Sequence, residues 1–214
     1  SGAGSYTVVA TIDDTNYEGT ASDTLVIGKA TATITLSDLA ATYDGSAKAV
    51  SATTSPEGLT VDVTYDGSAT APSSAGSYPV VATIVDANYE GTASDTLAIS
   101  KAVAIVTLGD LVATYDGSAK VASAITDPAG LTVSLAYDGA ATTPTAAGSY
   151  AVEATIDDAN YEGTASGTLV ISKAVATVTL ADLAATYDGS AKVVFATTDP
   201  EGLSIILSYD GAPE

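Results

Sequence analysis

The chain has 214 residues, of which 46% are apolar and 15% charged, so it is long enough to bury more than one core. Its 26 acidic residues against six lysines give a net charge of −20, which disfavours nucleic acid and anionic membranes as partners. His, Cys, Met, Trp and Arg are absent, so the side chains most used in redox, imidazole and guanidinium chemistry are missing. We therefore predict that the chain is not an enzyme. Its apolar runs are too short for a transmembrane helix, so we also predict no membrane insertion.

The chain begins with "SGAGSYTVVATI" (1–12), and similar segments return at 74–84 and 147–156. "YDGSAK" starts at positions 43, 115 and 187, "NYEG" starts at 16, 88 and 160, and every spacing is 72 residues. Residues 29–100 and 101–172 are identical at 50 of 72 positions without a gap. These observations predict a tandem repeat of 72 residues in which each copy has the same fold.

Within one repeat, several segments predict β-strands because β-branched residues alternate with polar ones or cluster between turn residues. The segments are 32–36, 47–53, 59–65, 77–84 and 95–99. The Asp-Gly pairs that start at 44 and 66 suit a type I′ hairpin turn, in which both residues have positive φ. No segment has the apolar periodicity of a helix. The pattern predicts an all-β fold of antiparallel β-sandwiches.

The segment "AGSYPVV" (75–81) resembles the tyrosine corner of immunoglobulin-like (Ig-like) domains, in which a Tyr at the start of strand F hydrogen-bonds to the upstream backbone. The tyrosine-corner residues are Tyr6, Tyr78 and Tyr150. If Tyr78 starts strand F, then 95–99 is strand G and ends the domain.

This frame sets the domain boundaries. Residues 29–100 and 101–172 are two complete Ig-like repeats, residues 1–28 are the C-terminal strands F and G of a repeat, and residues 173–214 are the N-terminal part of one. The alternative frame places the boundaries in the Pro-, Ser- and Ala-rich loop 68–76. We expect the joined repeats to form a rod, because identical units add length and the linkers between them have only two residues.

The ordered set "ITLSDLAATYDGSAKAV", "SPEGL", "TYDG", "AGSY", "NYEG" and "TLAISKA" resembles the MBG and YDG-type Ig-like repeats of large bacterial cell-surface proteins and adhesins. The resemblance covers the whole chain. It implies an extracellular location at the cell surface and a structural role in a stalk or adhesive array. It brings no catalytic residues and leaves the ligands mostly unassigned.

Two loops are rich in side-chain oxygens of the kind that bind Ca²⁺. The candidate ligands are Asp13, Asp14, Asn16 and Glu18 in the first loop, and Asp157, Asp158, Asn160 and Glu162 in the second. The middle copy has Val85 in place of the first Asp, and the order of acids is not that of an EF-hand. A solvated turn is the alternative, and we predict no cofactor. In the Ig-like frame, the loop that contains Asn88 instead braces the joint to the preceding repeat.

Several lysines and tyrosines have two interpretations, one as a functional site and one as an ordinary structural residue. Asn88 with Lys48 or Lys29 is a candidate for an intramolecular isopeptide bond, but Lys48 follows a turn and is expected in solvent. Tyr43 and Tyr65 are expected to cover the end of a small core, although exposed tyrosines also suit a platform for sugars.

Two function classes remain open. The first is a stalk or spacer within a longer parent protein. The alternative is an adhesin module whose loops recognise a host or environmental glycan or protein. The repeats are nearly alike and none has a distinctive loop, which favours the spacer.

Residues 1–28 and 173–214 are complementary parts of one repeat, and each alone would expose an apolar face and unpaired strand edges. We predict that they meet head to tail, supplied by another copy of the chain or by neighbouring repeats of one array. Such a contact builds a filament. The donor residues are Tyr6, Val8, Ala10, Ile12, Leu25 and Ile27, and the acceptor residues are Val178, Leu180, Val194, Leu203, Ile205 and Leu207.

Overall fold

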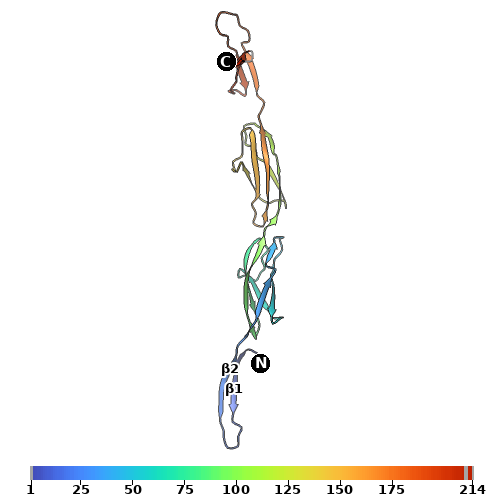
Figure 1. The fold of residues 1–214 in the computed structure, drawn as a ribbon, viewed down its shortest axis with the longest axis vertical. Helices are drawn as coiled ribbons and strands as arrows, with labels where there is room; N and C mark the ends of the chain where they lie inside the picture. Colours follow the sequence, from blue (N-terminus) through green and yellow to red (C-terminus); the bar gives the residue numbers. More distant parts are fainter. Residues whose placement is uncertain (1, 210–211, 214) are drawn as a thin grey trace. The chain divides into compact units, whose positions relative to one another are not determined.

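The computed structural model describes residues 2–209 and 212–213. All regular secondary structure in these residues is β-strand (Figure 1). The elements of residues 29–100 recur 72 positions later in residues 101–172. The all-β fold and the tandem repetition predicted from the sequence are therefore confirmed.

The strands are grouped by repeat. Residues 1–28 contain β1 (Gly4–Thr11) and β2 (Thr20–Ile27). Residues 29–100 contain β3 (Ala30–Thr31), β4 (Thr33–Ser37), β5 (Ala40–Thr42), β6 (Ser51–Ser55), β7 (Val61–Tyr65), β8 (Gly76–Ile84), β9 (Tyr89–Glu90) and β10 (Thr92–Ser100). Residues 101–172 contain β11 (Ala102–Val103), β12 (Ile105–Gly109), β13 (Val112–Thr114), β14 (Ser123–Asp127), β15 (Val133–Tyr137), β16 (Gly148–Ile156), β17 (Tyr161–Glu162) and β18 (Thr164–Ser172). Residues 173–214 contain β19 (Thr177–Ala181), β20 (Phe195–Asp199), β21 (Ser208–Tyr209) and β22 (Ala212–Pro213).

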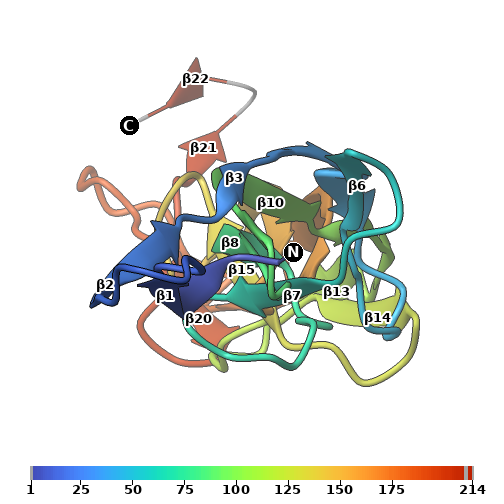
Figure 2. The ribbon, with the colours of Figure 1, turned by 90° about the horizontal axis from the view of Figure 1, so that it is seen from below.

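The main sheet of residues 29–100 has the order β5-β10-β8-β7. Strands β8 and β10 form a long antiparallel hairpin at its centre, and β5 pairs with β10 in parallel. Strands β4 and β6 form a separate antiparallel pair, and β3 pairs with β9 in parallel. The strands β3, β6, β7, β8 and β10 can be followed in Figure 2. The repeat is thus a β-sandwich in which one hairpin, β8–β10, joins both outer strands of the larger sheet.

The core lies between the four-stranded sheet and the β4–β6 pair. Successive residues of β8 alternate between buried and exposed, as expected for a strand with one face in the core. Tyr65, Val80, Leu97 and Ile99 form the buried cluster, and Leu36 of β4 packs against it. Because the hairpin supplies three of these residues, the core depends on β8 and β10.

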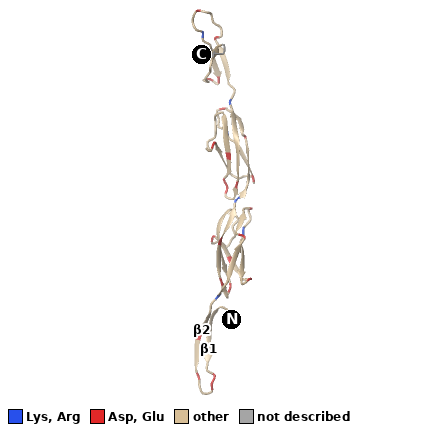
Figure 3. Cartoon of the chain, in the orientation of Figure 1, with Lys and Arg blue, Asp and Glu red and all other residues tan. Residues whose placement is uncertain are grey.

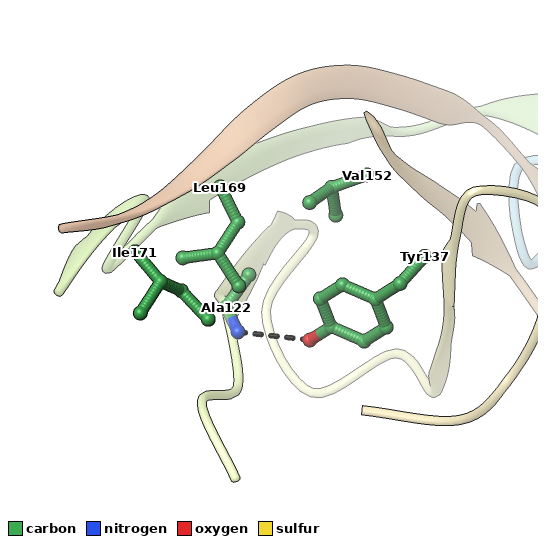
Figure 4. Close-up of a cluster of buried hydrophobic side chains, with 5 residues drawn as sticks. All are labelled: Ala122, Tyr137, Val152, Leu169 and Ile171. Carbon is green, nitrogen blue, oxygen red and sulfur yellow. Dashed lines mark hydrogen bonds between the residues drawn. The ribbon is translucent and has the colours of Figure 1, made fainter. Parts of the chain in front are cut away.

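The next repeat has the same sheet order, β13-β18-β16-β15. Its core cluster consists of Ala122, Tyr137, Val152, Leu169 and Ile171 (Figure 4). The Ala122 N–H donates a hydrogen bond of 2.9 Å to the hydroxyl oxygen of Tyr137, and both residues are buried. Tyr137 and its equivalent Tyr65 are therefore core residues and not part of an exposed platform for sugars.

The two Asp-Gly pairs of a repeat differ in conformation. Asp66 and Gly67 both have positive φ, at 47° and 79°, so the type I′ turn predicted there is confirmed. At the other pair only Gly45 has positive φ, and the prediction of a type I′ turn is wrong. There the Asp44 carboxylate instead accepts hydrogen bonds from the Ser46 N–H and from the Lys48 ammonium. In the last copy, Asp210 and Gly211 lie outside the described residues.

Residues 4–27 form the hairpin β1–β2, labelled in Figure 1, with the register of β8–β10. Tyr6 lies opposite Leu25, as Tyr78 lies opposite Leu97. In residues 173–209, β19 pairs with β20 as β4 pairs with β6. However, residues 184–186 and 205–207, which correspond to β5 and to part of β7, are not strands. Their counterparts pair with the β8–β10 hairpin, which explains why they form strands only in the complete repeats.

The chain divides into two compact units. The first unit contains Ser1–Thr107, Ala124–Ser134 and Ala154–Ala165. The second unit contains Leu108–Ser123, Leu135–Glu153 and Ser166–Glu214. The first unit therefore includes one end of the repeat 101–172 together with the whole of residues 29–100.

Candidate assembly interface

A tyrosine corner fixes the start of the long hairpin in each copy. The Tyr78 hydroxyl donates a hydrogen bond of 3.0 Å to the Ser74 carbonyl. Its ring folds back over Gly76, where an added Cβ would lie 3.2 Å from the hydroxyl oxygen, so this close approach favours glycine. The equivalent bonds join Tyr150 to Ala146 at 3.0 Å and Tyr6 to Gly2 at 2.7 Å.

The loop at the other end of the hairpin is held by an aspartate. One carboxylate oxygen of Asp158 accepts hydrogen bonds from the N–H groups of Asn160 (2.7 Å) and Tyr161 (2.9 Å). Asp86 makes the same two bonds in the preceding repeat, at 2.7 and 3.0 Å. Because an aspartate readily caps the backbone two residues on, the segment Asp-x-Asn-Tyr fixes its own turn. The turn holds the Asn and Tyr side chains in a defined position.

These two side chains contact the preceding repeat within the first unit. The Asn160 side-chain oxygen accepts a hydrogen bond of 2.9 Å from the Ala75 N–H. The Tyr161 ring meets the Tyr43 ring edge to face, with the centroids 5.3 Å apart and the planes at 81°, a favourable arrangement for an aromatic pair. Within the repeat 101–172, the Lys101 ammonium donates to the Asp158 carbonyl at 2.6 Å and so holds the same loop at its base. We call this set of contacts the joint.

The joint recurs one repeat earlier. The Asn88 side-chain oxygen accepts from the Ala3 N–H at 2.8 Å, and the Lys29 ammonium donates to the Asp86 carbonyl at 2.7 Å. Sequence reasoning placed Asn88 at a joint but did not identify Ala3 or Asp86. The available signal was the Asp-x-Asn spacing, which is typical of such turns and recurs with the 72-residue period.

The calcium candidates belong to two different loops, four residues in each. Asp14 accepts a hydrogen bond of 2.7 Å from the Asn16 N–H, and Asp158 and Asn160 take part in the turn and the joint. Asp13, Glu18, Asp157 and Glu162 are exposed. In residues 2–209 and 212–213, no group of three or more acidic side chains is arranged to hold a metal ion. Figure 3, a cartoon coloured by residue type, shows acidic residues in every repeat and few lysines.

Lys48 is not in solvent, so that expectation is wrong. Its side chain is only 19% exposed, and its ammonium lies 2.5 Å from the Asp44 carboxylate. The hydrogen bond from Lys48 and those from Ser46 hold the pKa of Asp44 well below its usual range. Lys192 and Ser190 likewise lower the pKa of Asp188 to about 2. The isopeptide candidates make ordinary polar contacts: Lys48 with Asp44, Lys29 with the Asp86 carbonyl and Asn88 with Ala3.

The donor residues predicted for head-to-tail contact lie on one face of the hairpin β1–β2. Val8 and Leu25 are 49% and 50% exposed, whereas Val80 and Leu97, the same positions in the complete repeat, are fully buried. Tyr6, Ala10 and Ile12 are also exposed, and Ile27 is half-buried. The hairpin therefore presents to solvent the apolar face that its counterpart buries.

The acceptor residues lie in the incomplete repeat at the other end of the chain. Val178, Leu180 and Leu203 are exposed, and Val194, Ile205 and Leu207 are half-buried. The Val194 N–H donates to the Tyr209 hydroxyl at 3.1 Å, as the Val50 N–H does to Tyr65 at 3.0 Å. The local framework of the core is thus present in residues 173–209.

A cavity of about 440 Å³ lies beside this repeat, within the second unit. It is lined by Tyr115, Ala146, Ala147, Lys173, Ala174, Val175, Ala176, Pro200 and Leu203. Tyr115, Ala147 and Lys173 are the counterparts of the joint residues Tyr43, Ala75 and Lys101, 72 positions later. The cavity is therefore the counterpart of one side of the joint.

In the residues that the structure describes, no helix is long and apolar enough to cross a membrane. Comparison with curated proteins gives no match. A family model, the MBG domain, matches the chain four times in tandem, at residues 1–31, 32–103, 104–175 and 176–214. These matches begin three residues later than the predicted boundaries at 29, 101 and 173. In the structure, β3 (Ala30–Thr31), which lies before the match at 32–103, pairs with β9, which lies inside that match. The four matches together span all 214 residues, and the chain belongs to the MBG domain family.

Proposed function

We propose that this chain is a structural segment of an extracellular bacterial surface protein, in which its repeats act as a stalk or spacer. The MBG domain is a structural and adhesin-type repeat, not an enzyme family, and it is typical of surface proteins. The joint supports the spacer role because the same Asn and Lys contacts recur at both joints. An array built from such joints gains length by repetition.

The proposal includes head-to-tail assembly by strand complementation. The hairpin β1–β2 of one copy completes residues 173–209 of another, supplying in trans the two strands that β8 and β10 supply in a complete repeat. The observation that carries this proposal is the contrast at equivalent positions: Val80 and Leu97 are fully buried, whereas Val8 and Leu25 are half exposed. The same contacts serve when the two segments belong to neighbouring repeats of one longer array.

The burial provides the driving force. Removing a Val or Leu side chain from water is worth about 1.5–3 kcal/mol. Several such side chains on the hairpin offset the translational and rotational freedom that two copies lose on association. The contact uses a different surface on each copy and does not close, so it extends into a filament.

Sedimentation velocity over a range of concentrations tests the assembly. We expect the wild-type chain to form a concentration-dependent series of oligomers and Leu25→Asp to remain a monomer. Val26→Asp is the matched control, because Val26 is exposed and its counterpart Ala98 remains exposed in the complete repeat. A wild-type chain that stays monomeric at the highest concentration would contradict assembly by complementation.

A glycan array probed with the same chain tests the spacer role separately. A spacer binds none of the glycans at micromolar concentration. Specific binding would favour the alternative role, an adhesin module.

A further inference from the structure

We infer that Asn16 and Tyr17 of a second copy occupy the cavity beside Tyr115 and Lys173. This inference rests on the head-to-tail assembly proposed above and names a recognition site within it. The apolar face of the hairpin supplies the general driving force, and the hairpin loop would supply the contact that sets its register and orientation.

The joint within the first unit is the template. There, the loop Asp158–Tyr161 follows β16, and its Asn and Tyr dock onto Ala75 and Tyr43 of the preceding repeat. In the hairpin β1–β2, the equivalent loop follows β1 and carries Asp14, Asn16 and Tyr17. If the hairpin packs on residues 173–209 in the way that β16 and β18 pack in their own repeat, its loop reaches the cavity.

The cavity presents the counterparts of the residues that hold the loop at the joint. Tyr115 is 44% exposed, whereas Tyr43, which packs against Tyr161, is half-buried. The other walls of the cavity are mainly apolar, with Pro200 and Leu203 from the incomplete repeat. A tyrosine ring suits such a site because it covers apolar surface and keeps its hydroxyl at the edge, near water.

The turn of the incoming loop is partly formed. The Asp14 carboxylate accepts a 2.7 Å hydrogen bond from the Asn16 N–H, the first of the two bonds that Asp158 accepts from Asn160 and Tyr161. Tyr17 is 74% exposed, and the Asn16 amide group bonds within its own loop, to the Thr15 hydroxyl at 3.4 Å. Binding therefore starts from a loop whose Asp14–Asn16 bond is already made, which lowers the entropic cost of association.

Three contacts follow from the template. The Asn16 side-chain oxygen accepts a hydrogen bond from the Ala147 N–H, as Asn160 accepts from Ala75. The Tyr17 ring meets the Tyr115 ring edge to face. The Lys173 ammonium donates to the Asp14 carbonyl, as Lys101 donates to Asp158. The negative charges of Asp13 and Asp14 also lie favourably near Lys173, the cation that lines the cavity.

Cross-linking between two variants tests the site directly, because the chain contains no cysteine. Full-length Asn16→Cys is mixed with full-length Ala147→Cys, and the mixture is treated with a short bis-maleimide, which tolerates more varied geometry than a disulfide. We expect a covalent heterodimer. The matched control is Val26→Cys mixed with Ala147→Cys, because Val26 pairs with Ser5 at the end of the hairpin away from the loop, and this pair should not cross-link.

A second measurement is the affinity of self-association. Tyr17→Ala should weaken association about 10-fold or more, as expected for a buried aromatic anchor, whereas Val26→Ala should leave it unchanged. If the wild-type chain assembles but Asn16→Cys and Ala147→Cys do not cross-link above the control, or if Tyr17→Ala assembles normally, the site is wrong while complementation stands. If the wild-type chain does not self-associate, both are wrong.

Discussion

Replacing Tyr137 by Phe should destabilise its own repeat. The Tyr137 hydroxyl accepts a hydrogen bond of 2.9 Å from the Ala122 N–H inside the core (Figure 4). Ala122 is 3% exposed, so water cannot easily replace the lost partner. The same bond exists at two other places in the chain, where the donor is less buried. Tyr65 accepts from the half-buried Val50, and Tyr209 accepts from Val194 in the incomplete repeat.

The magnitudes follow from this difference in burial. A buried N–H that loses its partner costs about 1–3 kcal/mol. We therefore expect Tyr137→Phe to lower the free energy of unfolding by about 2 kcal/mol and Tyr65→Phe by about 1 kcal/mol. Tyr209→Phe should change it by less than about 0.5 kcal/mol, as at other exposed sites. For a domain of this size, about 2 kcal/mol corresponds to a decrease in Tm of roughly 8–16 °C.

Hydrogen exchange resolved by peptide is the appropriate assay, because it assigns the loss of protection to one repeat. For Tyr137→Phe, protection should fall in the peptides of β15, β16 and β18. Scanning calorimetry gives the matching shift in Tm. Equal effects for all three variants, or the largest effect for Tyr209→Phe, would refute the argument from burial.

Three further predictions concern a glycine, a carboxylate and salt. Gly91→Ala should destabilise residues 29–100 by about 1–3 kcal/mol in thermal unfolding, because the new Cβ would lie 2.2 Å from the Ala32 carbonyl oxygen; Gly19→Ala is the control, since there the nearest atom is the flexible end of Ile12. Lys192 lowers the pKa of Asp188 to about 2, so the stabilising ion pair is complete above pH 4 and is lost as the pH falls from about 4 to 2. NMR titration of the Asp188 carboxyl should give a midpoint at about pH 2, and Lys192→Gln should raise that midpoint. Because each copy carries a net charge of −20, raising the salt concentration should strengthen self-association in sedimentation velocity, and weaker association at high salt would contradict apolar complementation.

Much of the sandwich could be predicted from local sequence, because its central strands alternate strictly. In β8, Val80, Ala82 and Ile84 face the core and the residues between them face solvent, which is the pattern that predicted the strand. The Asp66-Gly67 turn was predicted correctly, but the same pair at 44–45 was not, because there the Asp44 carboxylate accepts hydrogen bonds from Ser46 and Lys48. The alternation of a strand was therefore readable from the sequence, whereas an Asp-Gly pair alone did not determine its turn.

Other parts of the fold depend on distant partners. Strands β5 and β9 have only three and two residues, and both pair in parallel with segments far along the chain. So short a segment has no readable period, and its strand conformation comes from the partner. Residues 47–50 show the opposite error: their pattern predicted part of a strand, but the Lys48 N–H bonds to the Pro72 carbonyl, and β6 begins only at Ser51.

The joint was only partly predictable, for the same reason. Asn88 and Asn160 lie in polar turns, and local sequence gives such residues the pattern of a solvated loop. Their partners Ala3 and Ala75 are each 85 residues earlier, and the contact is to a backbone N–H, which has no signature in the sequence. The repeat period suggested that the loop faces the preceding repeat, but the contacting atoms required the structure.

The hairpin β8–β10 both completes the core of its own repeat and carries the loop that forms the joint. Strands β8 and β10 complete the core of their own repeat, and the loop between them, with Asn88, docks on the preceding one. A hairpin supplied in trans would therefore fold the acceptor repeat and form a joint in one step. A variant in the apolar face, such as Leu25→Asp, removes both contributions together, because the loop is positioned only when the strands are seated. A variant in the loop, such as Tyr17→Ala, removes only the aromatic contact of the joint and should leave weakened but measurable assembly, whereas Leu25→Asp should leave none, so comparing the two variants separates core completion from docking of the loop.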